Sequence, residues 1–191
     1  MKNISKGKII LNIIFLLFLS SCSKDEGSEV CDLLVCYNGG GCVDGICQCP
    51  AGYEGFNCLD VLTPKAIYVT KIQFSEFPSM KGIHPWDFNG GSKAEPFMRI
   101  SRNGIFKWDS EISFHDADPN GTYLIIPDTT IKFPRFDEVT FSLLDWDDIG
   151  GDDLIDTYTM DLFTKERGLR TQLVVNMLSG TKLTVWLRHE F

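Results

Sequence analysis

The chain has 191 residues, 43% of them hydrophobic, and a formal net charge of −8. The hydrophobic content excludes wholesale disorder, and the negative charge argues against a nucleic acid or a bare anionic membrane surface as partner. The seven cysteines divide into Cys22 alone and six within residues 31–58.

Residues 1–21 predict a lipoprotein signal peptide. Lysines in the first eight residues precede an apolar run at 9–19, a pattern typical of a secretory signal and too short to span a membrane. The segment ends in Leu19, two serines and Cys22, which resembles the lipobox of bacterial lipoproteins. The resemblance implies cleavage before Cys22, diacylglycerol on its sulfur and a fatty acid such as palmitate on its amino group. Two or more acyl chains make a stable anchor.

The alternative is a plain secreted protein in which Cys22 is incidental. Residues 22–30 form a short tether, and its start, Ser-Lys-Asp-Glu at 23–26, is similar to a surface-export signal of some Gram-negative lipoproteins. We therefore expect a protein held by lipid on a bacterial outer membrane and displayed outward, with periplasmic display left open. Removing the leader with its three lysines leaves 15 basic and 26 acidic residues, a net charge of −11, which makes the mature chain a candidate for binding cations.

Residues 31–58 predict a disulfide module. The cysteine spacing is C-x4-C-x5-C-x4-C-x-C-x8-C, and the segment resembles an epidermal growth factor-like domain, including its C-x-N-G-G-x-C stretch at 36–42. Spacing alone leaves 15 pairings open. The resemblance implies the bridges Cys31–Cys42, Cys36–Cys47 and Cys49–Cys58. A module this short cannot bury an adequate core, so cross-links formed in an oxidising compartment have to stabilise it.

Two metal sites are not expected in this module. The calcium-binding subtype of the family carries a cluster of acids and amides before its first cysteine, whereas only Glu29 is present here. Zinc is disfavoured because exported thiols oxidise and no histidine lies nearby. We expect the module to act as a spacer or a docking element.

Residues 59–63 predict a linker, and residues 64–191 predict an eight-stranded antiparallel β-sandwich. Alternating and β-branched runs recur between turn residues such as Asn103-Gly104 and Ser179-Gly180, a pattern typical of a sandwich. No long amphipathic helix is expected. The runs, assigned to about eight short strands, are 67–74, 96–101, 104–114, 122–127, 129–133, 138–146, 157–163, 171–177 and 181–188.

An acidic stretch after the run 138–146 has the spacing D-x-D-x5-D, at Asp145, Asp147 and Asp153. Together with the preceding turn at 134–138 it resembles the C-two domain, the calcium and phospholipid module of protein kinase C and the synaptotagmins. Asp137 replaces the asparagine usual in that turn. Residues 86–97 match the family's other calcium loop more loosely, and the basic lipid-binding strand offers little, so phospholipid is not an expected ligand.

The resemblance implies Ca²⁺ as cofactor. Calcium takes about six to eight oxygen ligands, which carboxylates on loops supply. Without a cation such carboxylates repel one another, so metal should stabilise the fold. Asn89 is an alternative to the first of the expected ligands, which are Asp87, Glu95, Asp145, Asp147 and Asp153.

Two alternatives to this site remain. The acids could merely solvate a surface loop. An EF-hand-like loop could start at Asp145, with Asp147, Gly150 and Asp156 at its third, sixth and twelfth positions, although Ile149 and the strand-like flanks argue against it.

No catalytic motif is present, and the three histidines are scattered, so we expect no enzyme; an acid pair for glycoside hydrolysis is a remote alternative. Most tryptophans fit a core, but Trp86 and Trp146 flank the metal loops and could face a ligand. The sequence thus predicts a non-catalytic surface lipoprotein whose sandwich uses calcium to bind an extracellular protein or glycan. The alternative is a carbohydrate-binding lipoprotein in which calcium is structural or absent.

Overall fold

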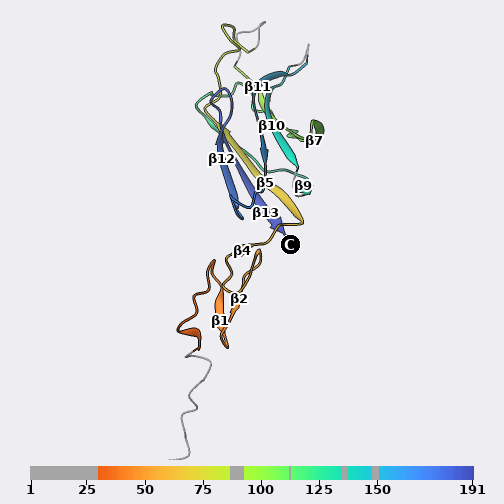
Figure 1. Ribbon diagram of the computed structural model, residues 1–191. Coiled ribbons are helices and arrows are strands. Elements are labelled where there is room, and N and C mark those ends of the chain that lie inside the picture. Colours follow the sequence, from red (N-terminus) through yellow and green to blue (C-terminus); the bar gives the residue numbers. More distant parts are fainter. Residues whose placement is uncertain (1–29, 87–92, 112, 135–136, 148–150) are drawn as a thin grey trace, which may run out of the picture. The chain divides into compact units, whose positions relative to one another are not determined.

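The computed structural model describes residues 30–86, 93–111, 113–134, 137–147 and 151–191 (Figure 1). The described chain divides into two compact units. The first contains the described residues up to Pro50 and Gly55–Cys58, and the second contains Ala51–Glu54 and Leu59–Phe191. The predicted signal peptide, Cys22 and the tether up to Glu29 lie outside the described residues. Within the part of the chain that the structure describes, no helix has the length and apolar character needed to cross a membrane.

The first unit is held by disulfides around a small hairpin. Strands β1 (Gly41–Val43) and β2 (Ile46–Gln48) pair antiparallel. The three bridges are Cys31–Cys42, Cys36–Cys47 and Cys49–Cys58, the pairs that the family resemblance implies. Among the described residues of this unit, the only buried hydrophobic side chains are Cys47 and Cys58, so the cross-links take the place of an apolar core.

One sheet of the second unit has four antiparallel strands in the order β11-β10-β6-β7. They are β6 (Pro96–Arg102), β7 (Ile105–Asp109), β10 (Glu138–Asp145) and β11 (Asp153–Asp161). The turn between β6 and β7 is Asn103-Gly104, with φ angles of 48° and 75°. Asn-Gly with two positive φ angles is the preferred two-residue hairpin turn, because its twist matches that of the flanking strands.

The other sheet has the order β12-β13-β5-β8, with β9 also paired to β5. Its strands are β5 (Ala66–Ser75), β8 (Thr122–Ile125), β9 (Ile131–Pro134), β12 (Gln172–Asn176) and β13 (Lys182–Glu190). A short pair, β3 (Tyr53–Glu54) with β4 (Asp60–Val61), completes the described strands of this unit and includes part of the predicted linker.

Strands β8 and β9 share one position in the sheet. β8 pairs with the second half of β5, from Ile72 to Ser75, and β9 pairs with the first half, from Ala66 to Val69. In the two described sheets, nine strands therefore fill eight positions. The prediction of a mostly β chain with an eight-stranded antiparallel sandwich is confirmed, although one of the eight is interrupted.

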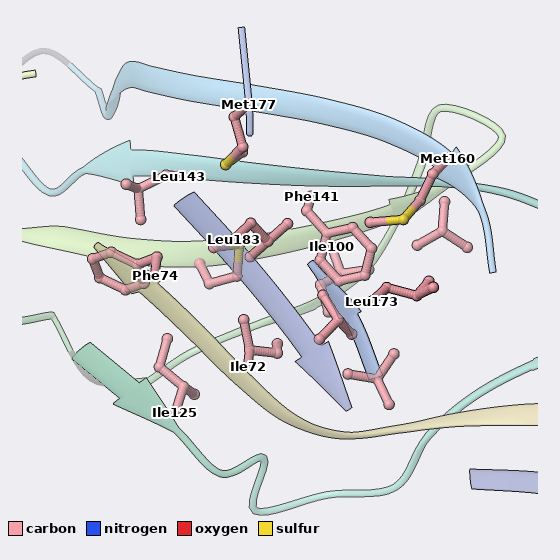
Figure 2. Packing of buried hydrophobic residues seen from close by; sticks show 14 of the residues in the cluster. Ile72, Phe74, Ile100, Ile125, Phe141, Leu143, Met160, Leu173, Met177 and Leu183 are labelled. Atoms are coloured by element: carbon pink, nitrogen blue, oxygen red, sulfur yellow. The ribbon is translucent and has the colours of Figure 1, made fainter. Parts of the chain in front are cut away.

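The core lies between the two sheets and follows the two-residue period of the strands. Met98 and Ile100 of β6 and Phe141 and Leu143 of β10 are fully buried, and Leu183 of β13 faces them from the other sheet (Figure 2). The residues between these positions point to the opposite side of each sheet. The alternation of apolar residues in the sequence therefore determines which face of each strand enters the core.

Most predicted strand limits shift by one or two residues, and two shift further. The run 104–114 is a strand only to Asp109, because the Ser110 hydroxyl accepts the Met98 N–H at 3.0 Å where a strand carbonyl would do so. The run 157–163 belongs to a strand that begins earlier, at Asp153, and pairs with the whole of β10.

Candidate functional site

One end of the four-stranded sheet collects predicted ligands from three strands. Asp145, the last residue of β10, pairs with Pro96 of β6 on one side and with Asp153 of β11 on the other. Glu95 directly precedes β6, and its carbonyl accepts the Trp146 N–H at 3.1 Å. The strand register thus brings Glu95, which lies 50 positions before Asp145, to the same end of the sheet as Asp145 and Asp153. We call these residues, with Asp147, the acidic rim.

Asp145 lies at the end of the core. It continues the inward series of Val139, Phe141 and Leu143 in β10 and is itself 0% exposed. Its Oδ1 accepts the Glu95 N–H at 2.5 Å, which ties the end of β10 to the start of β6. A buried carboxylate is costly unless hydrogen bonds compensate its lost hydration, so this bond is part of the fold as well as of the rim.

Two other rim carboxylates are paired with cations of the protein. Asp153 forms an ion pair with the Lys81 ammonium group, and Glu95 forms one with Nδ1 of His115. The hydrogen bond from His115 to Glu95, followed by the charge of that carboxylate, raises the pKa of His115 above its ordinary value. The rim therefore already attracts positive charge.

The carboxylates themselves do not gather around one point. Among the described residues, no group of three or more histidine, cysteine, aspartate or glutamate side chains is placed to hold a metal ion. Asp147, the fourth residue of the rim, is half-buried. The predicted ligand Asp87, like its alternative Asn89, lies outside the described residues. The donor chemistry suits calcium, and the backbone register is favourable, but the described side chains are turned toward protein partners.

Asp156 has a structural role that the sequence did not reveal. Its carboxylate is 2% exposed and accepts the backbone N–H groups of Thr157, Ser179 and Thr181 at 2.8, 2.9 and 3.1 Å. It therefore fixes the turn before β13. An EF-hand needs Asp156 as a ligand and a helix after the loop. Here the Asp156 carboxylate is occupied by three backbone N–H groups and the segment is the strand Asp153–Asp161, so the EF-hand-like alternative is excluded.

The two tryptophans beside the predicted metal loops differ from each other. Trp86 is only 6% exposed, packs in the core and donates its indole N–H to the Pro78 carbonyl at 2.9 Å. The prediction that it could face a ligand is wrong, because its ring is buried and its N–H already has an acceptor within the protein. Trp146 is 42% exposed and remains available to a ligand.

A hollow of about 400 Å³ opens beside the acidic rim, and the sequence analysis missed most of its residues. We call it the outer hollow. Its walls include Phe97, Arg99, Asp109, Trp146 and Asp152. The one available signal was that Phe97 and Arg99 alternate with Met98 and Ile100, which places them on the outward face of β6.

Lys132, one of the few basic residues of the predicted lipid-binding strand, lies close to two other side chains of the protein. Its ammonium group lies 2.8 Å from a carboxylate oxygen of Glu190 and 5.2 Å from the Tyr68 ring centroid. Its charge is therefore largely compensated within the protein.

No family model matches the chain, and no curated protein matches it in sequence. Solved structures match about two thirds of it. A C-two domain of plant Extended Synaptotagmin 1 has a TM-score of 0.46 and 15% identity over 68% of this chain and 97% of that one. A calcium-bound Extended-Synaptotagmin 2 structure with two such domains has a TM-score of 0.39 and 19% identity over 66% and 46%.

Human GIVD cytosolic phospholipase A2, in complex with a fluorophosphonate, has a TM-score of 0.46 and 14% identity over 65% of this chain. The match spans only 17% of the phospholipase chain. At TM-scores below 0.5 these similarities support no conclusion about function, and the resemblance to C-two domains stays a prediction.

Proposed function

We propose that the chain is a non-catalytic, lipid-anchored surface protein of a bacterial outer membrane whose second unit binds calcium at the acidic rim. The observation that carries the calcium proposal is the register of β10, which puts Asp145 between the start of β6 and the start of β11. Three carboxylates separated by up to 58 positions in the sequence (Glu95 to Asp153) thereby share one sheet edge.

Calcium binding at this rim requires an exchange of cations. The ion would take the place of Lys81 at Asp153 and of His115 at Glu95, while Asp147 and either Asp87 or Asn89 would add oxygen ligands. In both pairs the cation is exposed. Water screens such pairs and they stabilise the fold little, so releasing them opposes calcium weakly. A cation that bridges the ends of β6, β10 and β11 stabilises the folded state because the unfolded chain does not bind it comparably.

The test is a thermal melt of the full-length protein with millimolar calcium and then with chelator. We expect calcium at about one hundred times its dissociation constant to raise the melting temperature by roughly 5–10 °C. Asp147→Asn with Asp153→Asn should abolish the shift. Asp161→Asn, an exposed acid at the other end of β11, should retain it. The absence of a shift in the wild type would refute the calcium site.

The lipid anchor rests on the leader and on the lipobox-like sequence that ends at Cys22. Expressed in a Gram-negative host, the protein should partition into detergent and carry the mass of a diacylglycerol and a fatty acid. Cys22→Ala should remove both properties. An unmodified, water-soluble wild-type product would favour the secreted alternative.

Carbohydrate binding is a second candidate function. The observation that favours it is the outer hollow with the exposed ring of Trp146 at its edge.

A further inference from the structure

The outer hollow lies on the face of the four-stranded sheet that points away from the core. Met98 and Ile100 are fully buried between the sheets, so Phe97 and Arg99 project to the opposite side. The end of β7 with the residues after it, Trp146 after β10 and Asp152 before β11 complete the walls. Its volume of about 400 Å³ falls within the range of about 300–1,000 Å³ usual for small-molecule pockets.

The charges in the outer hollow disfavour an anion. Nη2 of Arg99 lies 3.2 Å from a carboxylate oxygen of Asp152 and 3.5 Å from one of Asp109, and Glu111 contributes a third carboxylate to the lining. His115 also lines the hollow and pairs with Glu95. The two basic side chains of the lining, Arg99 and His115, are thus outnumbered by three carboxylates. A phosphate or carboxylate ligand would meet net negative charge, which rules against both classes.

The same side chains suit hydroxyl groups. Each carboxylate oxygen accepts hydrogen bonds and the guanidinium presents several donors in a fixed plane. Asp109, Arg99 and Asp152 lie next to one another, so donors and acceptors alternate along the wall. Neighbouring hydroxyls on a sugar ring, each a donor and an acceptor, match this alternation.

Trp146 supplies an apolar face beside this polar wall. Its side chain is 42% exposed, while its backbone N–H is bonded to the Glu95 carbonyl at 3.1 Å, and the neighbouring Asp145 is anchored in the core. The ring is therefore carried on a fixed backbone. An exposed indole offers a flat apolar surface with one polar tip, which fits the C–H face of a pyranose.

We propose that the outer hollow binds a neutral saccharide, with a pyranose ring over Trp146 and its hydroxyls bonded to Asp109, Asp152 and Arg99. This deepens the second candidate function and rests on it. The hollow contains no proposed calcium ligand but adjoins the acidic rim through His115 and Trp146. Keeping calcium at a millimolar level in every titration, and measuring calcium binding separately by the melt, keeps a failure of one proposal distinguishable from a failure of the other.

The test is isothermal titration calorimetry of the full-length protein with cellohexaose, maltohexaose, mannohexaose and xylohexaose. Oligogalacturonate and spermidine serve as the anionic and cationic probes. We expect saturable binding of at least one neutral hexamer. Trp146→Ala should weaken it by about tenfold or more, as is usual when a buried aromatic contact is truncated.

Two further variants keep the test decisive. Asp109→Asn preserves the shape of the strand end and should also weaken binding by about tenfold, because it removes the charge and replaces one acceptor oxygen by an NH2 donor. Trp186→Ala removes a tryptophan of β13, in the other sheet, and should leave the affinity unchanged. Lack of binding by every neutral hexamer, binding of only a charged probe, or unchanged affinity in both Trp146→Ala and Asp109→Asn would overturn the proposal.

Discussion

Asp156 shows how one carboxylate can serve the fold while it resembles a ligand. In the sequence it belongs to the same acidic stretch as Asp145 and Asp153, and nothing in the pattern separates them. Burial and hydrogen bonding do so in the structure, where its two oxygens accept three backbone N–H groups. Two of the three donors belong to the turn before β13, more than twenty positions later in the sequence. The residues next to Asp156 therefore do not reveal its role.

Replacing Asp156 should therefore destabilise the second unit severely. Asp156→Ala would leave three backbone donors without their acceptor, and we expect the free energy of unfolding to fall by about 3 kcal/mol or more. Urea denaturation measures the change. The exposed Asp161→Ala on the same strand should change stability by less than about 0.5 kcal/mol, and an equal effect of both variants would contradict the role of Asp156.

Two histidines should affect stability in opposite directions as pH changes. Burial lowers the pKa of His189 in the folded protein. The unfolded state then binds more protons below pH about 6.5, so this residue removes stability as pH falls through that value toward the folded pKa. The pKa of His115 is raised in the folded protein. Its contribution to the stability of the fold is therefore fully present below pH about 6.5 and is lost as pH rises through the folded pKa.

Urea denaturation at about pH 7.5 and pH 5.5 tests these signs. His189→Gln should reduce the loss of stability on acidification relative to the wild type, and His115→Gln should increase it. The ring of His189 contacts the rings of Phe163 and Phe191, at a centroid distance of 6.4 Å from each. Any loss of this packing in His189→Gln is common to both pH values. The same pH dependence in all three proteins would refute the assignment.

At the scale of elements, alternation of apolar residues predicted the strands well and their ends poorly. The strand β7 ends at Asp109 because of the Ser110 hydroxyl, a side-chain contact that no periodicity reveals. The D-x-D-x5-D stretch was expected to lie between two strands; in the structure Asp145 ends β10 and Asp153 begins β11, four residues before the predicted run. The outer hollow could not be predicted, because it depends on side chains of several strands meeting after the sheet has formed.

The ion pair between β11 and the segment before β6 should compete with calcium. Lys81→Met removes the ammonium group from Asp153 and should increase calcium affinity up to about fivefold, which corresponds to an exposed ion pair of up to about 1 kcal/mol. Titration calorimetry measures it. Lys182→Met, which removes an ammonium group 2.6 Å from Glu76 elsewhere in the unit, is the matched control. Lower calcium affinity in Lys81→Met would count against the exchange of cations.

For the molecule as a whole, the two units depend on different kinds of stabilisation. All cysteines lie at or before Cys58, whereas the second unit has a continuous apolar core between its sheets. A reductant should therefore unfold residues 31–50 and leave the sandwich intact. Hydrogen exchange with and without reductant tests this: amide protection should fall in the first unit and stay constant in β5–β13. Loss of protection in both would show that the sandwich requires the bridges.

The split between β8 and β9 has a consequence for how copies of the protein behave when crowded. Both strands lie at the outer edge of their described sheet, next to β5, and each has only four residues. Between them the chain leaves the sheet, and Ile126 is 70% exposed. A long unbroken edge would offer another chain a continuous row of unpaired backbone groups and so invite aggregation. Two short edges separated by a gap offer a much poorer template, so the interruption protects the sandwich against edge-to-edge pairing.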